Sequence, residues 1–239
     1  MIKVLYLYHD IMNLYGDNGN IRFLEKALND QGQEVEITRK TVGDKLDDLN
    51  EYDVIYCGPG MESNRNVCLK HLSQYKKELL EAFNNDKVFL FTGNSYEMFG
   101  SDLNGLYDCP DKGIGFFDFN VTEQSEKRYT ADVIVTTDLF VEKCVGFINK
   151  CSKLSDYKSP LFRIVGKVGD TNSECDGIHE RNFFGTQLIG PVLIKNPYFA
   201  RYFIKTILKT KGIEDYKEVE YPNIMKEYET TINELSKDI

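Results

Sequence analysis

The cysteines and histidines are the most reactive side chains of this sequence. There are six cysteines and three histidines among 239 residues. A cysteine beside a histidine would indicate nucleophilic catalysis, because the histidine can generate the attacking thiolate. Cys57 ends a predicted strand and His9 follows another, so a Cys57–His9 pair is one candidate site. No Cys-x-x-Cys motif occurs, and we expect neither a metal nor a cofactor.

A turn at residues 92–96, Thr-Gly-Asn-Ser-Tyr, is a second candidate site. It follows an apolar strand and precedes a predicted helix, and such a turn can direct backbone N–H groups at a ligand. From these residues alone, an ordinary strand-to-helix turn remains the alternative. The chain has no P-loop, no glycine-rich dinucleotide motif and no Gly-x-Ser-x-Gly nucleophile motif.

The first half of the chain alternates between predicted strands and helices. Four runs have the length and pattern of strands, at residues 3–8, 34–38, 54–57 and 88–91. Helical spacing of apolar residues predicts a helix from about residue 20 and another over residues 66–83. The alternation indicates a parallel sheet covered by helices on both faces. Ligands bind beyond the carboxyl ends of such strands, here residues 9–20, 58–64 and 92–100.

The second half of the chain has a different pattern. Short β-rich segments recur, at residues 114–119, 129–135, 145–147, 162–168 and 183–188. They predict an antiparallel extension of the sheet and no second domain. Asn196 as N-cap and Pro197 in the first turn predict a helix that ends near Gly212. We therefore expect one domain over residues 1–212 and an acidic helical tail over residues 213–239.

Composition and charge limit the classes of partner. The chain has 38 acidic and 29 basic residues, a formal net charge of −9. Such a chain repels the phosphates of nucleic acids, so nucleic acid is not an expected partner. No apolar run approaches the roughly 20 residues needed to span a bilayer, and the N-terminus lacks the features of a signal peptide. These observations predict a soluble, cytoplasmic protein.

Three stretches of sequence together resemble one family. They are residues 14–20 (Leu-Tyr-Gly-Asp-Asn-Gly-Asn), the strand and turn at residues 88–100, and residues 177–191 with their Gly-Pro turn. They are similar to the cobyric-acid-synthase-like class I glutamine amidotransferases, in particular the amidotransferase subunit of lipid II isoglutaminyl synthase. The similarity covers roughly residues 1–212 and implies a flavodoxin-like three-layer α/β sandwich.

The resemblance also implies a reaction and a partner. In this family a cysteine thiolate attacks the side-chain amide of glutamine, backbone N–H groups hold the oxyanion, and a histidine acts as base. The released ammonia passes to a Mur-ligase-like, ATP-dependent synthase subunit, which amidates a carboxylate on a cell-wall precursor. This chain departs from that pattern at both catalytic positions. Counting back from Tyr96 places Gly93 at the nucleophile position, or Thr92 if a one-residue slip is allowed, and neither is a cysteine. Ile189 precedes the Gly-Pro turn where the family has histidine.

The resemblance assigns further positions of this chain to the pocket that holds the substrate in the family. The turn at residues 58–60 matches the loop that helps to form the oxyanion hole, although Pro59 removes one N–H donor. Arg128 falls where the family has an arginine near the substrate, and a solvated charge is the alternative. The predicted pocket residues are Gly58, Gly60, Asn94, Ser95, Arg128 and Gln187.

Three functional hypotheses follow. The first is an amidotransferase-like protein without glutaminase activity, which acts as a non-catalytic subunit or binding partner of the Mur-ligase-like protein. The second is an active amidotransferase with a displaced nucleophile such as Cys57. The third is a module that binds glutamine or another amino acid without hydrolysing it. His179 precedes the last strand of the family motif, and we expect it to be structural.

Overall fold

A six-stranded, mainly parallel sheet forms the centre of the computed structural model, which describes residues 1–46, 48–156 and 158–237. Its strand order is β12-β13-β4-β3-β1-β2, and only β12 runs antiparallel to its neighbour. The strands are β1 (Ile2–Leu7), β2 (Val35–Lys40), β3 (Val54–Cys57), β4 (Val88–Thr92), β12 (Ile178–Glu180) and β13 (Phe183–Thr186). The predicted α/β class with a parallel sheet is therefore confirmed.

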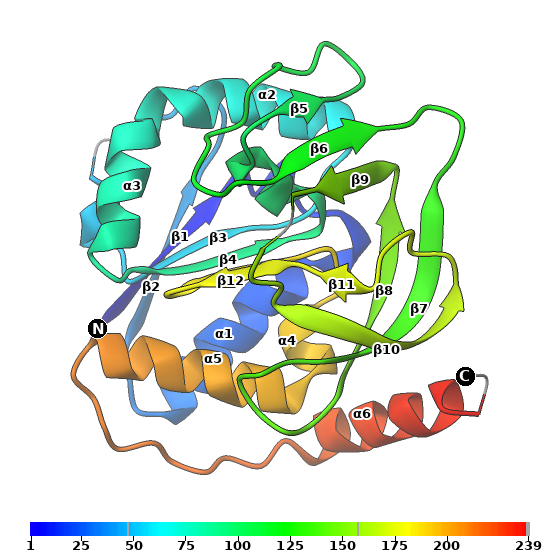
Figure 1. The fold of residues 1–239 in the computed structure, drawn as a ribbon. Coiled ribbons are helices and arrows are strands. Elements are labelled where there is room, and N and C mark those ends of the chain that lie inside the picture. The colour runs from blue at the N-terminus through cyan, green and yellow to red at the C-terminus, as the bar shows by residue number, and fades with distance from the viewer. Residues whose placement is uncertain (47, 157, 238–239) are drawn as a thin grey trace.

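Helices cover both faces of this sheet (Figure 1). One face carries α1 (Asn18–Asp30), α4 (Val192–Lys195) and α5 (Pro197–Thr210), and the other carries α2 (Glu62–Leu72) and α3 (Lys76–Asn84). Successive side chains of a strand point to opposite faces. Val4 and Tyr6 accordingly pack with α1 and α5, whereas Leu5 and Leu7 pack with α2 and α3.

The prediction of one continuous helix over residues 66–83 is wrong, because the structure has two helices there. A 3-10 turn, Ser73–Tyr75, separates α2 from α3. Serine is a weaker helix former than the leucines and lysines on either side. Side-chain contacts also favour the break, because His71 hydrogen-bonds the Tyr8 hydroxyl at 2.9 Å and its ring packs against Tyr75.

The β-rich half forms two further sheets. One has the order β11-β10-β7-β8 and the other β5-β6-β9. Their strands are β5 (Leu103–Asn104), β6 (Asn120–Glu123), β7 (Tyr129–Thr136), β8 (Cys144–Lys150), β9 (Ser152–Ser155), β10 (Phe162–Gly169) and β11 (Cys175–Asp176). Antiparallel extension of the main sheet is thus limited to β12. Residues 114–119 form no strand, because their backbone bonds to the 3-10 helix Gly93–Phe99, as in Ile114 N–H to Met98 O.

The side chain of Asn196 does not cap α5, contrary to the sequence prediction. It holds β8 instead: its Oδ1 accepts from Val145 N–H at 2.7 Å and its Nδ2 donates to Val145 O at 2.9 Å. The last helix, α6 (Pro222–Leu235), lies against β7 and β8, and Tyr228 Oη donates to Lys143 O at 2.8 Å. Residues 238 and 239 of the predicted tail lie outside the described residues, and the boundary at residue 212 stays a prediction.

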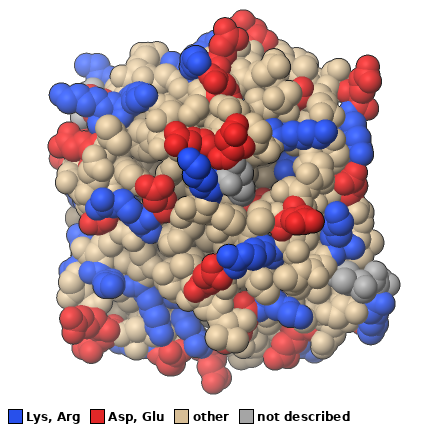
Figure 2. All heavy atoms as spheres, in the orientation of Figure 1, with Lys and Arg blue, Asp and Glu red and all other residues tan. Residues whose placement is uncertain are grey.

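The surface carries charges of both signs. On the face drawn in Figure 2, acidic and basic side chains are interspersed over the whole outline. Within the described ranges, no helix is both long and apolar enough to cross a membrane. The same part of the chain contains no group of three or more histidine, cysteine, aspartate or glutamate side chains that could hold a metal ion.

Candidate functional site

Gly93 and Ile189 lie next to each other at the carboxyl end of the sheet. Gly93 follows β4 and Ile189 follows β13, and these parallel neighbours end in register at Thr92 and Thr186. A Cβ atom built on Gly93 would lie 3.1 Å from Ile189 Cγ2 and 2.5 Å from Pro59 Cβ. The backbone φ of Gly93 is +58°, which a residue with a side chain rarely adopts. Pro59 and Ile189 therefore occupy the space that a side chain at position 93 would need.

The side-chain amide of Asn94 hydrogen-bonds the backbone of the neighbouring loop. Gly60 N–H donates to Asn94 Oδ1 at 3.1 Å, and Asn94 Nδ2 donates to Gly60 O at 2.9 Å. Pro59 has no N–H group to offer. Two positions of the loop at residues 58–60 are thus unable to donate to a ligand, one because it is a proline and one because its donor is already paired.

A buried carboxylate ties the motif at residues 14–20 to the ends of β3 and β4. Asp17 Oδ2 accepts hydrogen bonds from Tyr56 Oη and, at 2.7 Å, from Thr92 Oγ1, while Asn20 Nδ2 donates to Oδ1 at 3.0 Å. Burial raises the pKa of Asp17 to about 6, although these hydrogen bonds oppose the shift. A Cβ on Gly58 would lie only 2.7 Å from Asp17 Oδ2, so this close approach requires glycine.

The six predicted pocket residues divide into two groups. Gly60, Asn94 and Arg128 line a cavity beside Gly93 and Ile189, and Gly58, Ser95 and Gln187 do not. Ser95 Oγ donates to Thr92 O at 2.8 Å and to Cys57 O at 3.1 Å, so it holds the turn together. The cavity measures about 20 Å³, roughly the space of one water molecule. Pockets for small ligands usually measure about 300–1,000 Å³.

The guanidinium group of Arg128 is already paired with other residues of the protein. Its Nη1 lies 2.8 Å from Glu62 Oε1, and its Nε donates to Asn149 Oδ1 at 2.8 Å. Burial of Glu62 opposes ionisation, but the hydrogen bond from Arg128 outweighs it and lowers the pKa of that carboxyl. Arg128 and Glu62 together form one wall of the small cavity.

A buried ion cluster, of which Glu97 and Glu123 line this cavity, was missed by the sequence analysis. Arg65 is 0% exposed, and its Nη1 lies 2.6 Å from Glu97 Oε2 and 2.8 Å from Glu123 Oε1. Gln187 Nε2 donates to the other Glu97 oxygen at 2.5 Å. No spacing in the sequence indicates this cluster, because its members come from α2, a 3-10 helix, β6 and the segment after β13. Sequence reasoning therefore placed Gln187 in a pocket, whereas it supports Glu97.

The cysteines near the site are buried thiols. Cys57 is 0% exposed and packs among apolar side chains; burial, with the charges of Cys68 and Asp17, raises its thiol pKa well above the ordinary value. No contact joins Cys57 to His9 in the part of the chain that the structure describes, and the His9 ring packs on Tyr6. Cys151 lines the small cavity, but burial and the nearby Glu62 raise its pKa to about 12. Neither thiol has the surroundings of a reactive thiolate.

Comparison with protein families matches residues 3–197 to the CobB/CobQ-like glutamine amidotransferase domain. The chain belongs to this family. The predicted resemblance is thereby confirmed, and it extends over most of the chain.

Two curated relatives carry the same name, lipid II isoglutaminyl synthase (glutamine-hydrolyzing) subunit GatD. The protein of Streptococcus pneumoniae is 27% identical over 229 residues, which are 95% of this chain and 88% of that protein. The protein of Staphylococcus aureus is 30% identical over 219 residues, which are 87% and 86% of the two chains. The similarity thus spans nearly the whole of each relative.

Solved structures show the same fold. A structure of PurLQS from Thermotoga maritima matches with a TM-score of 0.55 at 15% identity and covers 87% of this chain and 96% of that chain. A glutamine amidotransferase from Thermotoga maritima matches with a TM-score of 0.51 at 15% identity, covering 99% and 92%. These matches confirm the predicted class I glutamine amidotransferase fold.

Proposed function

We propose that this protein is a glutamine amidotransferase-like subunit without glutaminase activity, which acts in the amidation of a cell-wall precursor beside a Mur-ligase-like, ATP-dependent synthase. The observation that carries the proposal is the contact between Gly93, Ile189 and Pro59 at the place of the nucleophile and its base. This protein would act in the cytoplasm, where its partner would use nucleotide.

Hydrolysis of glutamine needs a nucleophile, a base and oxyanion donors; this site lacks side chains for the first two, and the loop at residues 58–60 offers fewer free donors for the third. Glycine at position 93 has no atom that can form a thioester, and isoleucine at position 189 cannot take a proton. The Gly60 N–H is paired with Asn94. Because members of such a catalytic group act as a unit, loss of the nucleophile alone removes most of the rate.

The partner subunit is proposed from the relatives. Both are named as subunits of a synthase, and this chain covers 88% and 86% of their lengths. Binding of a partner uses surface residues and does not require the catalytic side chains, so the two functions can be lost separately. The small cavity gives no comparable support to an amino-acid-binding module, and the buried Cys57 gives none to a displaced nucleophile.

The proposal is tested by treating the intact chain with an electrophilic glutamine analogue, with and without competing glutamine, and measuring intact mass. We expect no adduct that glutamine suppresses, and no ammonia release from glutamine. A glutamine-sensitive adduct on any cysteine would overturn the proposal. A pull-down with the Mur-ligase-like protein of the same cell tests the second half: a stable complex supports it, and failure to co-purify at micromolar concentrations contradicts it.

A further inference from the structure

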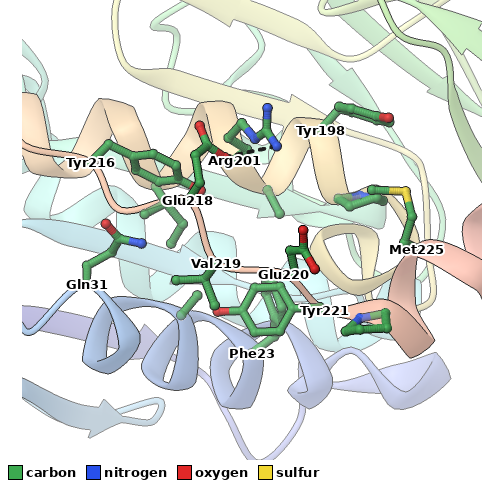
Figure 3. Close-up of a pocket in the computed structure, with 15 residues that line it drawn as sticks. Phe23, Gln31, Tyr198, Arg201, Tyr216, Glu218, Val219, Glu220, Tyr221 and Met225 are labelled. Atoms are coloured by element: carbon green, nitrogen blue, oxygen red, sulfur yellow. Dashed lines mark ion pairs between the residues drawn. The ribbon is translucent and has the colours of Figure 1, made fainter.

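A second and much larger cavity lies away from this site, between α1, α5 and the segment that leads into α6 (Figure 3). Its volume is about 420 Å³, within the usual range of small-molecule sites. Phe23 of α1, Ile204 of α5 and Met225 of α6 contribute apolar walls. This cavity is therefore large enough for a small organic molecule, which the cavity beside Gly93 is not.

Aromatic rings surround the cavity and are held in fixed positions. Phe23 packs edge-on against Tyr221 with ring centroids 5.4 Å apart, and Tyr221 Oη donates to Asp30 Oδ2 at 2.7 Å. Tyr216 carries the Lys205 ammonium 4.5 Å from its ring centroid. Lys205 does not itself line the cavity. The aromatic walls are thus formed before any ligand arrives, which lowers the entropic cost of binding.

The segment that closes the cavity is attached at several points. Gln31 Oε1 accepts from Lys217 N–H at 2.8 Å, and Gln31 Nε2 donates to Lys217 O at 2.8 Å. Arg201 Nη2 lies 3.1 Å from Glu218 Oε2, an ion pair drawn as a dashed line in Figure 3. The polar groups of Gln31, Arg201 and Glu218 are therefore already paired within the protein.

Glu220 is the charged lining residue that stays unpaired among the described residues. No hydrogen bond or ion pair joins its carboxylate to another residue that the structure describes. In Figure 3 its side chain points from the segment toward α5. A carboxylate attracts cations, whereas the rings of Tyr198, Tyr216 and Tyr221 already have Arg201, Lys205 and Lys26 near them. Charge complementarity therefore favours a positively charged ligand over a neutral or negative one.

We propose that this cavity binds a small organic cation, an ammonium compound with an aromatic or alkyl body. The apolar body lies among Phe23, Ile204 and Met225, and the ammonium group lies near Glu220. The net charge of −9 also favours a cation. A carboxylate ligand would have to separate Arg201 from Glu218. The inference is independent of the function proposed for the site beside Gly93.

Three probes of the same size separate charge from apolar fit: phenethylamine, 2-phenylethanol and phenylacetate. Each is titrated into the full chain by calorimetry or by NMR. We expect phenethylamine to bind with a Kd of about 1 mM, a reasonable value for so few atoms. The alcohol should bind about fivefold more weakly and the acid more weakly still, as expected for one exposed charge. Equal affinity for all three, preference for the acid, or no binding of the amine would each overturn the proposal.

Substitutions test whether the probes bind in this cavity. Glu220→Gln should weaken phenethylamine about fivefold and leave the alcohol unchanged. Glu214→Gln is the matched control, because it removes the same charge from the same segment outside the cavity. Val219→Trp, at a half-buried position, should fill the cavity and abolish binding of both probes while the melting temperature stays within a few degrees. An equal response of Glu220→Gln and Glu214→Gln would show a general charge effect and refute the assigned site.

Discussion

Asn94 and Gly60 form a pair of hydrogen bonds in which each residue both donates and accepts. Without the Asn94 amide, Gly60 N–H and Gly60 O would be available to hydrogen-bond a ligand or water. The site beside Gly93 is therefore closed by polar contacts as well as by the packing of Pro59 and Ile189. We therefore expect that a cysteine at position 93 and a histidine at position 189 would not by themselves produce glutaminase activity.

The double variant Gly93→Cys with Ile189→His should show no glutaminase activity. The new Cβ at position 93 would lie 2.5 Å from Pro59 Cβ, and the Gly60 N–H would still be paired with Asn94. Overpacking and a positive φ should also lower the free energy of unfolding by about 1–3 kcal/mol. Ammonia release and urea unfolding measure the two effects, with Ile189→Val as the matched stability control. Glutamine turnover by the double variant would contradict the role assigned to the closed loop.

Asn94→Ala should destabilise the protein by about 1–3 kcal/mol. Truncation leaves both Gly60 N–H and Gly60 O without their partner in a partly buried place. Urea unfolding measures the loss, and Asn13→Ala serves as control, since Asn13 makes one exposed hydrogen bond to His9 O. A change no larger than that of the control would mean that water replaces the Asn94 amide at no cost.

Asp17 should make the protein relatively more stable as the pH falls from about 6 toward 4. Its folded pKa is raised to about 6 from the ordinary 3.8, chiefly by burial, so in this window the folded state binds a proton that the unfolded state does not. The free energy of unfolding of the wild type minus that of Asp17→Asn should thus rise as pH falls, by at most about 1.4 kcal/mol per pH unit. A difference that is flat between pH 6 and pH 4 would contradict the raised pKa.

Arg65→Met should be strongly destabilising, by about 3–5 kcal/mol. It leaves the buried carboxylates of Glu97 and Glu123 without their cation. Adding Glu97→Gln and Glu123→Gln to Arg65→Met removes the uncompensated charge and should recover part of the loss. Chemical unfolding of the single and triple variants measures both quantities. If the triple variant is no more stable than the single one, the loss comes from packing and not from unpaired charge.

The positions of β3 and β4 along the chain followed from the sequence because these strands are local, continuous apolar runs. β3 and β4 are buried along their whole lengths, and the apolar pattern shows this directly. The adjacency of Gly93 and Ile189 was also predictable, since the resemblance located each one at the end of a strand. Family membership then supplied the fold that brings those ends together.

Features that depend on distant partners were not predictable. Arg65 lies just before the helix predicted over residues 66–83, and only the fold brings Glu97 and Glu123 to it. Residues 114–119 have the apolar pattern of a strand, but their backbone partners belong to a 3-10 helix and not to a sheet. Asn196 has the residue type and place of a helix cap, yet the nearby β8 backbone competes successfully for its amide.

The bond between Gln31 and Lys217 also has a consequence for biosynthesis. The two residues are 186 positions apart, so the ribosome must produce most of the chain before Lys217 can reach α1. Until then Phe23 and the neighbouring face of α1 lack the cover that Tyr221 later supplies. Translation proceeds at roughly 5–20 residues per second, which leaves this apolar surface open for on the order of ten seconds or more. The emerging polypeptide therefore offers chaperones a binding surface that closes only after Lys217 and Tyr221 have been synthesised.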